Sequence, residues 1–413
     1  MRVAITGLGI WSALGRTRVE FEQRLRAGES GVRPVARMDV SHPFFRSRSA
    51  AVLSDEASLR PEIDQTMIAD LTLAVSQAAL RDAGLPNPPT DPSEASRFGM
   101  TLGTSHGGNI AFMRLIRERL GVAPGEPDPQ LALSCSPTVL GQVASRVGVR
   151  GPTVTVSTAC ASGTNSIGRA AELIELGRAD LMLAGGADLF TELSFSGFNV
   201  LGAMTRTVCR PMDSRRDGMV LGDGAAMLVL ESESRARARG ARIYALIAGH
   251  ALANEAYHPT APRPDGMEAA RVMQAALESA GLSPQDIDYV NLHGTGTEAN
   301  DEMELKALQR VFGSESRSMP LLSSIKAQVG HTLGASGSVE VVATALALHG
   351  QFAPPGIHLE HPISPFASWP FVRGKAQPAR LRAALSNSFG FSGNLASIVL
   401  LQGDSEHASD GNF

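Results

Sequence analysis

The stretch TVTVSTACASGTNSIGRAAELIELG, residues 153–177, decides the fold class of this chain. It opens with alternating Thr and Val, which is the pattern of a β-strand, and continues with a run of small residues. From Ile167 onward, apolar residues recur at i, i+3, i+4 and i+7, which predicts a helix over 163–176. Gly177 is placed to terminate that helix. A strand that turns directly into a helix is the building unit of an α/β protein.

The rest of the chain repeats this alternation of short apolar runs with helical segments. The helical patterns cover 65–83, 267–280 and 338–350. The strand-like runs include RVAIT, FGMTLG, DLMLAGG, AAMLVLE, DYVNLHG, PLLSSIK and LASIVLLQ. Such alternation predicts an α/β fold with largely buried strands.

The pattern also occurs twice. RVAITGLG near the start is echoed by RIYALIAG at 242–249, and GMVLGDGAAMLVLES at 218–232 is echoed by SFGFSGNLASIVLLQG at 388–403. We therefore expect two similar halves, 1–241 and 242–413, each with its own sheet.

Composition limits the class of protein. The chain has 413 residues, of which 43% are hydrophobic and 19% charged, with a formal net charge of −4. This profile is typical of a soluble globular enzyme and does not favour nucleic acid or a membrane surface as partner. The chain contains no run of about 18 uninterrupted apolar residues, so no membrane span is expected. We interpret the first 15 residues as a buried strand rather than a signal peptide.

The three cysteines suggest neither a disulfide framework nor a metal site. Cys135, Cys160 and Cys209 form no CxxC pair and no metal-ligand spacing. We expect no metal and a reducing, cytoplasmic location.

Cys160 lies where the strand enters the helix. The unpaired N–H groups and the positive dipole end of a helix N-terminus favour a thiolate there. The small neighbours from Ala159 to Gly163 allow a substrate to approach. The alternative is that Cys160 is simply a small buried hydrophobe, the commoner fate of a free cysteine.

Two histidines are candidate partners for this thiol. His293 ends a strand and precedes Gly-Thr-Gly-Thr, and His331 follows Lys326 at a strand-to-helix transition. His106 and His258 are weaker candidates with Gly or Pro neighbours. Any of them can be structural. A Cys–His pair is compatible with a cysteine protease, a transglutaminase-like acyl transferase or a thiol enzyme acting on thioesters.

Four ordered motifs resolve these alternatives by resemblance. They are TACASG around Cys160, HGTGT at His293, SSIKAQVGH ending at His331, and NSFGFSGN at 387–394. With them the chain resembles the β-ketoacyl-[acyl-carrier-protein] synthases, most closely the type II elongating synthase, over almost its full length. The resemblance implies the thiolase-like fold, in which two pseudo-duplicated halves form a five-layered αβαβα core, and a homodimer.

The resemblance also implies a decarboxylative Claisen condensation. Cys160 would take an acyl chain from acyl carrier protein, with the backbone N–H groups of Cys160 and Phe391 as the oxyanion hole. His293 and His331 would polarise the malonyl thioester as CO₂ leaves. The product would be a 3-oxoacyl-carrier protein two carbons longer. No cofactor is implied, because both substrates are carried on the phosphopantetheine of the carrier.

Supporting roles follow from the same resemblance. Lys326 would organise the site electrostatically, and Glu304 would support the histidine and lysine network. Phe391 would also be a gate that moves when the cysteine is acylated. Residues expected to contact the phosphopantetheine arm are Thr260, Thr295 and Thr297.

Some loop residues depart from the family pattern. The C-terminal loop reads FGFSGNL, with Ser392 beside the gate, and SHGG places His106 where the family has an apolar acyl-pocket residue. These departures fit a specialised pathway (polyene, aryl polyene or type II polyketide) at least as well as fatty-acid synthesis. The expected docking helix at 58–70 has Arg60 as its only cation. The alternative docking residues are either Arg206, Arg210, Arg215 and Arg216, or Arg46 and Arg48, unless these arginines are simply solvated.

The main alternative from another class is a non-catalytic chain-length factor, the partner subunit of a ketosynthase heterodimer. Such subunits lack the active cysteine, which this chain has. A degradative thiolase is disfavoured, because all three cysteines lie before residue 210 and none is in the second half. A heterodimer with a chain-length factor stays open alongside the homodimer.

Overall fold

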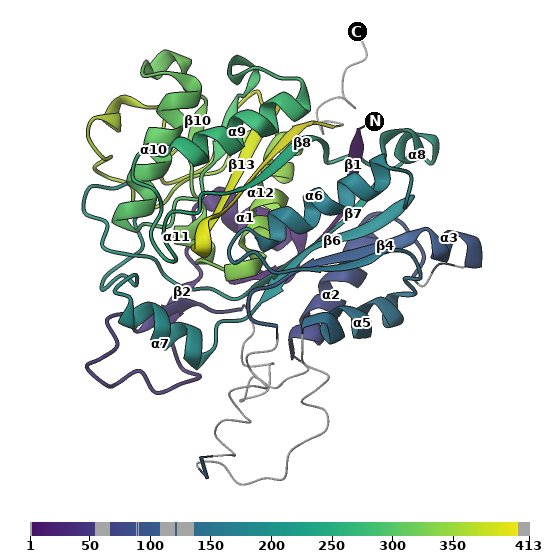
Figure 1. The fold of residues 1–413 in the computed structure, drawn as a ribbon, viewed down its shortest axis with the longest axis horizontal. Coiled ribbons are helices and arrows are strands. Elements are labelled where there is room, and N and C mark those ends of the chain that lie inside the picture. The colour runs from purple at the N-terminus through teal and green to yellow at the C-terminus, as the bar shows by residue number, and fades with distance from the viewer. Residues whose placement is uncertain are drawn as a thin grey trace.

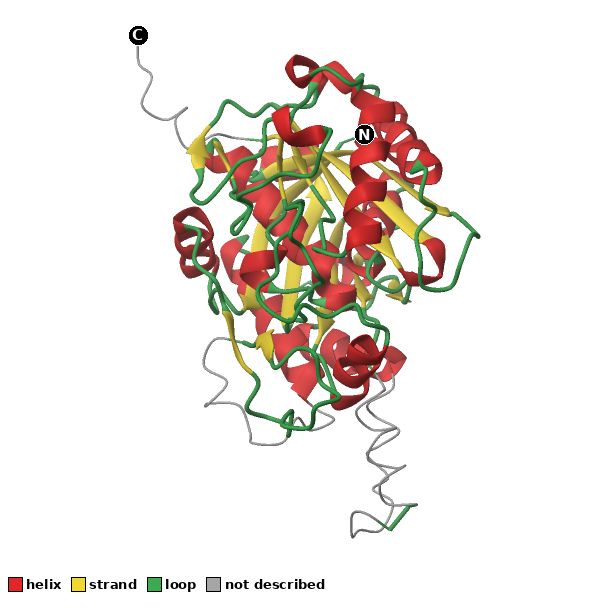
Figure 2. Cartoon of the chain, turned by 90° about the vertical axis from the view of Figure 1, so that its left-hand side faces the viewer, coloured by secondary structure: helices red, strands yellow, loops and turns green. Residues whose placement is uncertain are grey.

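The structure is a computed structural model that describes residues 2–53, 67–87, 89, 91–107, 120–121 and 136–403 (Figure 1). Its centre is one sheet of ten strands in the order β10-β9-β13-β14-β8-β1-β7-β6-β4-β5. Helices cover the strands on both sides, as the turned view shows (Figure 2).

The ten strands form two blocks with the same internal plan. The first block consists of β1 (Val3–Ser12), β4 (Phe98–Gly103), β5 (Thr153–Val156), β6 (Leu181–Asp188) and β7 (Gly224–Ser232). The second consists of β8 (Ala245–Asn254), β9 (Tyr289–Asn291), β10 (Leu321–Ser323), β13 (Ala383–Gly390) and β14 (Asn394–Gln402). If the strands of each block are numbered 1 to 5 in chain order, their order across the sheet is 3-2-4-5-1 in both blocks.

The directions of the strands agree as well. In each block the third, second and fourth strands are parallel, whereas the fifth is antiparallel to the fourth and to the first. The two echoes in the sequence fall on equivalent strands, β1 with β8 and β7 with β14. The internal duplication is thus confirmed, and the boundary at 241/242 stays a prediction.

The expectation of two separate sheets is wrong. β1 pairs with β8 through Val3–Ile247, Ala4–Leu246 and Ile5–Ala245, so the two blocks are joined along this edge into one continuous sheet. Each block still forms its own β layer of the fold, because α6 and α12 pack between them.

Helices complete the five layers. α2 (Met67–Asp82) and α5 (Ser136–Val147) share a core with the outer face of the first block, and α9 (Met267–Ala280) and α10 (Glu298–Phe312) do so for the second. Between the blocks lie α6 (Ser162–Glu175) and α12 (Ser336–Gly350), which share a core with β1, β7, β8 and β14. The predicted αβαβα arrangement is therefore present.

Shorter elements connect these layers. The helices are α1 (Arg18–Ala27), α3 (Pro92–Ser96), α7 (Glu192–Val200), α8 (Glu233–Ala238) and α11 (Lys326–Val329). The short strands are β2 (Val32–Pro34), β3 (Ser49–Ala51), β11 (Phe352–Ala353) and β12 (Gln377–Pro378). In the described part of the chain, no helix is both long and apolar enough to cross a membrane.

Strand β7 shows why the sequence folds into layers. Its alternate side chains point to opposite faces, as the pleat requires. Ala226, Leu228 and Leu230 join the central core, whereas Ala225, Met227 and Val229 join the outer core with α2. A strand that is apolar on both faces is stable only between two covered faces, which is the position that β7 occupies.

The central helices are held close to one another by small residues. A Cβ placed on Gly163 of α6 would lie 2.7 Å from the backbone nitrogen of Ser338 in α12. The predicted end of α6 is confirmed, since Gly177 adopts a left-handed φ of 65° and donates its N–H to Ile174. Because the segments after β5, β9, β10 and β13 enter one region between the blocks, residues far apart in sequence can meet there.

Candidate active site

Cys160 lies in the sharp turn between β5 and α6. Ala159, just before it, has a φ of 49°, in the left-handed region that non-glycine residues rarely adopt. The turn is closed by Ser162, whose hydroxyl donates to the Ala159 carbonyl at 2.6 Å and accepts from the Thr158 N–H at 2.8 Å. Gly390 packs against this turn, because a Cβ there would lie 3.0 Å from the Cys160 nitrogen. These contacts fix the direction of the thiol.

The expectation of a thiolate is wrong for the free protein. Burial raises the pKa of Cys160 to about 11, although Lys326 and the backbone N–H groups of Phe391 and Cys160 lower it. Cys160 is only 8% exposed, so loss of hydration is the largest influence on its pKa. At neutral pH the sulfur carries its proton. The two N–H groups that reach it are those predicted to form the oxyanion hole.

His331 lies between α11 and α12, and its ring is held by the turn that follows it. Its Nδ1 accepts the backbone N–H of Leu333 at 3.1 Å and lies 3.1 Å from the Ser336 hydroxyl. Because an N–H group can only donate, Nδ1 must be unprotonated, and the proton of the neutral ring is on Nε2. Burial and the Lys326 charge hold the pKa of His331 well below its ordinary value.

His293 follows β9 and has the same protonation pattern for a different reason. The Nζ of Lys326 donates to the His293 carbonyl at 2.6 Å and lies 3.2 Å from His293 Nδ1. An ammonium has no lone pair, so Nδ1 accepts and Nε2 carries the proton. Burial, Lys326 and then His331 lower the pKa of His293 well below its ordinary value. The two rings lie 5.4 Å apart at 83° to each other.

Lys326 is buried behind the histidines and forms an ion pair with Glu340 of α12. Burial raises the pKa of Glu340 to about 7, although the Lys326 charge lowers it. The sequence interpretation missed Glu340. Its signal was a single acidic residue in the otherwise apolar helix SGSVEVVATALALHG.

Glu304 supports the backbone rather than the imidazole. Its carboxylate accepts the N–H groups of His293 and Gly294, both at 2.8 Å, and the Asn387 amide at 3.2 Å. Burial raises the pKa of Glu304 to about 7. Glu304 therefore positions the turn that carries His293. Its predicted role, support of the whole histidine and lysine network, is narrower in the structure and acts on this turn.

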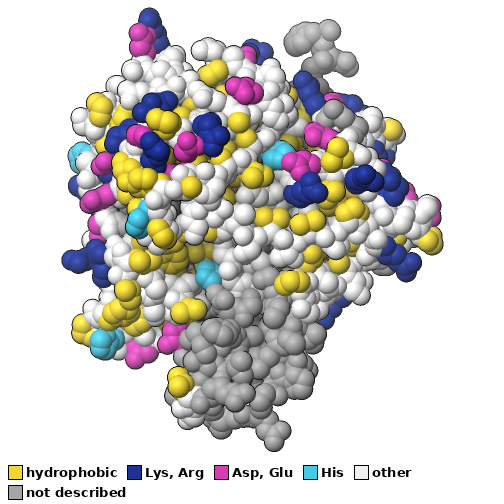
Figure 3. Space-filling model, viewed as in Figure 1, with side chains coloured by type: hydrophobic (Ala, Val, Ile, Leu, Met, Phe, Trp, Pro, Cys, Tyr) yellow, Lys and Arg dark blue, Asp and Glu magenta, His cyan; other side chains and the backbone are white. Residues whose placement is uncertain are grey.

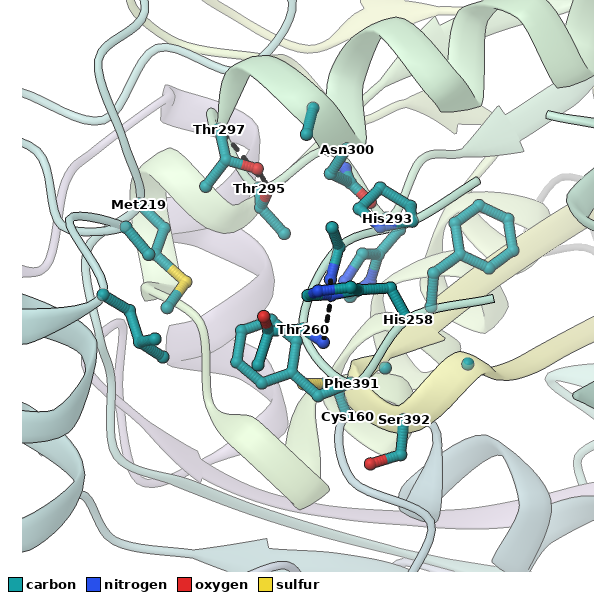
Figure 4. Close-up of a pocket in the computed structure, with 18 of the residues that line it drawn as sticks. Cys160, Met219, His258, Thr260, His293, Thr295, Thr297, Asn300, Phe391 and Ser392 are labelled. Carbon is teal, nitrogen blue, oxygen red and sulfur yellow. Dashed lines mark hydrogen bonds between the residues drawn. The ribbon is translucent and has the colours of Figure 1, made fainter. Parts of the chain in front are cut away.

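A cavity of about 220 Å³ brings the predicted residues together (Figure 4). Cys160, His293 and His331 line it with apolar side chains that include Phe198, Met219 and Phe389. The residues predicted to contact the phosphopantetheine arm also line it: Thr260, Thr295 and Thr297. The weaker candidate His258 lines it too, whereas Lys326 and Glu304 do not belong to this lining.

His106 lies outside the lining of this cavity. Its N–H donates to Asp188 at 3.0 Å, and its buried Nδ1 has no hydrogen-bond partner within the described part of the chain. Residues 108–119, which follow it, are outside the described residues, so its acyl-pocket role stays a prediction.

Phe391 begins the short turn Phe391–Gly393 beside the thiol. Its ring contacts Phe198 at 5.5 Å between centroids. The next residue, Ser392, has a φ of 60° and is held on both sides, since its N–H donates to Pro259 and its carbonyl accepts from the Asn254 amide, both at 2.7 Å.

The arginines proposed for carrier docking are not equally available. Arg216 is buried, where it bonds the carbonyls of Thr297 and Glu298 and pairs with Glu302, so the docking role assigned to it is wrong. Arg215 pairs with Asp213 and Glu360. Arg206 and Arg48 are exposed, and basic and acidic side chains are interspersed on the face seen in Figure 3. Arg60 and Cys135 lie outside the described residues.

Comparisons with known proteins place this site in a family. The model "Beta-ketoacyl synthase, N-terminal domain" matches residues 1–236, and "Beta-ketoacyl synthase, C-terminal domain" matches residues 244–360. The chain belongs to the β-ketoacyl synthase family. As a β-ketoacyl synthase it is a condensing enzyme of fatty-acid or polyketide biosynthesis, as the sequence predicted.

Individual relatives of this β-ketoacyl synthase agree. It is 35% identical to 3-oxoacyl-[acyl-carrier-protein] synthase 2 of Vibrio cholerae, over 96% of this chain and 98% of that protein. Among solved structures it resembles the ishigamide ketosynthase/chain length factor, with a TM-score of 0.87 and 35% identity over 97% of this chain and 99% of that one. It also resembles a type II polyketide ketosynthase solved with its acyl-carrier protein, with a TM-score of 0.89 and 30% identity over 97% and 99%.

Proposed function

We propose that Cys160 is the nucleophile and that His293 and His331 are the two hydrogen-bond donors of a decarboxylative condensation on acyl carrier protein. The observation that carries this proposal is the cavity in which the buried thiol faces two neutral imidazoles, both with the proton on Nε2. Neutral N–H donors can stabilise a developing enolate oxygen without themselves gaining or losing a proton.

In the first half-reaction, the Cys160 sulfur attacks the thioester carbonyl of an acyl-carrier protein. The N–H groups of Cys160 and Phe391 stabilise the oxyanion; both act on the sulfur in the free protein, where they lower its pKa. The bond from the carbonyl carbon to the phosphopantetheine sulfur breaks, and that sulfur takes the proton that the thiol loses. The products are acyl-Cys160 and free carrier.

In the second half-reaction, malonyl-carrier protein enters and loses CO₂. The electrons of the broken C–C bond form an enolate whose oxygen accepts the Nε2–H groups of His293 and His331. The enolate carbon then attacks the acyl-Cys160 carbonyl and expels the sulfur, which regains a proton from water. The product is a 3-oxoacyl-carrier protein. Burial and then the charge of Lys326 lower the pKa of both imidazoles, which keeps the two rings neutral.

The carrier protein is the proposed partner for both substrates. The neighbour solved with its acyl-carrier protein supports this, and so do the three threonines that line the cavity. We also propose that the chain is a catalytic subunit rather than a chain-length factor, since it has its own nucleophile. The assembly that we propose for it is a homodimer. Within the described residues, β5 is the last strand at one end of the sheet and is partly exposed.

Intact mass spectrometry tests these assignments. Wild type and Cys160→Ala are mixed with holo-carrier protein that is loaded with saturated or polyenoyl chains, before and after malonyl-carrier protein is added. An acyl adduct on wild type alone, converted to 3-oxoacyl-carrier protein, is the expected result. Acceptance of saturated chains indicates fatty-acid elongation, and acceptance of polyenoyl chains alone indicates a specialised pathway. An adduct of equal yield on Cys160→Ala contradicts the assignment of the nucleophile.

A further inference from the structure

Asp188 ends β6 as a fully buried carboxylate that binds two distant segments. From the segment after β4, it accepts the Thr104 hydroxyl and the Ser105 N–H, both at 2.7 Å, and the His106 N–H at 3.0 Å. From the segment after His331, it accepts the Gly334 N–H at 2.7 Å. All four partners donate, and each carboxylate oxygen takes two of them. A neutral amide of the same shape cannot satisfy such a set.

The contact with Gly334 bears directly on His331. The N–H that fixes the His331 tautomer belongs to Leu333, which has a φ of 54°. A leucine in this left-handed region is strained, so its surroundings must hold it there. The adjacent Gly334 N–H, bound to Asp188, supplies such a hold. A Cβ on Gly334 would lie 2.5 Å from the Asp188 carboxylate, so the turn and the carboxylate are in close contact.

The other segment contacts the turn of the nucleophile. Thr104 donates its N–H to the Val156 carbonyl at the end of β5. A Cβ on Gly103 would lie 2.5 Å from the carbonyl of Ser162, in the first turn of α6. Asp188 therefore links the start of the helix that follows Cys160 with the turn that orients His331.

We propose that Asp188 is a positioning residue of the condensation, which acts through the Leu333–Gly334 turn to hold the His331 proton on Nε2. This inference rests on the proposed role of His331. It predicts that Asp188 affects decarboxylation more than acyl transfer, since His331 donates only in the second half-reaction.

The test compares Asp188→Asn with wild type in three measurements. In Asp188→Asn one acceptor oxygen becomes an NH₂ group. Where it replaces Oδ2, the N–H groups of Ser105 and Gly334 lose their partner; where it replaces Oδ1, the Thr104 hydroxyl can accept from it and the His106 N–H loses its partner. We expect the decarboxylation of malonyl-carrier protein to fall about 100-fold, the typical cost of a misplacement of about 1 Å. Acylation of Cys160 should stay within a few-fold of wild type. In protein labelled with ¹⁵N at histidine, the chemical shifts of the two ring nitrogens of His331 should no longer be those of a neutral ring protonated on Nε2.

A second variant guards against misfolding of the first. Gly334→Ala keeps the carboxylate and pushes the turn away from it, and it should shift the same resonances in the same direction. The matched control is Glu231→Gln, another fully buried carboxylate, which pairs with Arg239. Glu231 faces Leu181 at the opposite end of β6, about 23 Å away at about 3.3 Å per residue. It should leave the His331 resonances unchanged.

Unchanged His331 resonances in both folded variants, Asp188→Asn and Gly334→Ala, overturn the proposal. An equal loss of both half-reactions does so too, because it assigns Asp188 a purely structural role. The resonances report on the turn whether or not the chain acts on malonyl-carrier protein. A failure of the proposed function, seen in wild type, is thus distinguishable from a failure of this inference.

Discussion

The two halves of the molecule have one topology and place different chemistry at equivalent points. In the first half, the turn from the third strand, β5, to the central helix α6 carries Cys160. In the second half, the connection from β10 to the central helix α12 carries Lys326 and His331. The exits of the second strands also correspond, with His106 close after β4 and His293 after β9. The duplicated fold supplies two pairs of equivalent places, and the side chains decide what each one does.

The halves differ in the groups that each places beside the cavity. The second half buries the Lys326–Glu340 pair and Glu304 beside the cavity, whereas the first presents a thiol that burial keeps protonated. The charge of Lys326 crosses the boundary between the halves, since it lowers the pKa of both imidazoles and of Cys160. The comparison teaches that burial sets the protonation of these groups and that one buried cation acts on groups from both halves. The predictions below test that division of labour.

Removal of the cation should have the largest effect. Lys326→Met leaves Glu340 buried without its partner, which typically costs about 3–5 kcal/mol of unfolding free energy. It should also strongly slow condensation, because the donor that holds the Nδ1 and carbonyl of His293 is lost. Urea denaturation and a condensation assay measure the two effects. As a control, Lys326→Met/Glu340→Gln should recover part of the stability and none of the activity. A single variant as stable as wild type would contradict the buried pair.

Removal of one donor should cost somewhat less. His331→Ala takes away one Nε2–H group, and the loss of such a donor typically lowers the rate by about 10²–10³. Because the donor acts on the enolate, preformed acyl-Cys160 should accumulate normally and react slowly with malonyl-carrier protein in a single-turnover experiment. His250, a partly buried histidine outside the cavity lining, is the control. His250→Ala should condense at the wild-type rate. Equal losses in the two variants would remove the special role of His331.

Much of this arrangement was predictable from local patterns. The helix that follows Cys160 and the internal duplication depend on apolar spacing, which sequence records directly, so they were predicted well. Burial depends on the whole fold and not on local sequence. The predictions of a Cys160 thiolate and of a surface position for Arg216 are therefore wrong. Glu340 and Asp188 were missed because their partners, Lys326 and Gly334, are brought near only by the fold.

The reactivity of the thiol should change with pH in a way that tests the charge crossing between the halves. A pKa raised to about 11 means that the thiolate fraction of Cys160 rises roughly tenfold per pH unit from neutral pH upward. Alkylation by iodoacetamide, followed by peptide mass mapping, should rise accordingly between about pH 7 and 10. Lys326→Met should be slower than wild type at each pH, because the cation that lowers the pKa is gone. A plateau near neutral pH would mean that the thiol is activated in the free protein.

The smallest effect should come from the turn beside the thiol, where the first half meets the second. Ser392 has a φ of 60° and a ψ of 23°, so Ser392→Gly relieves left-handed strain of about 1–2 kcal/mol. The added backbone freedom of glycine in the unfolded chain opposes this by about 0.4–1 kcal/mol. The two terms nearly offset each other, so the unfolding free energy should change by about 1 kcal/mol or less. Ser392→Val, β-branched at the same φ, should instead be clearly less stable, because valine resists this conformation. If urea denaturation shows both variants equally stable, the turn leaves this conformation at no cost. In that case its bonds to Pro259 and Asn254 do not hold the Phe391 N–H at the Cys160 sulfur.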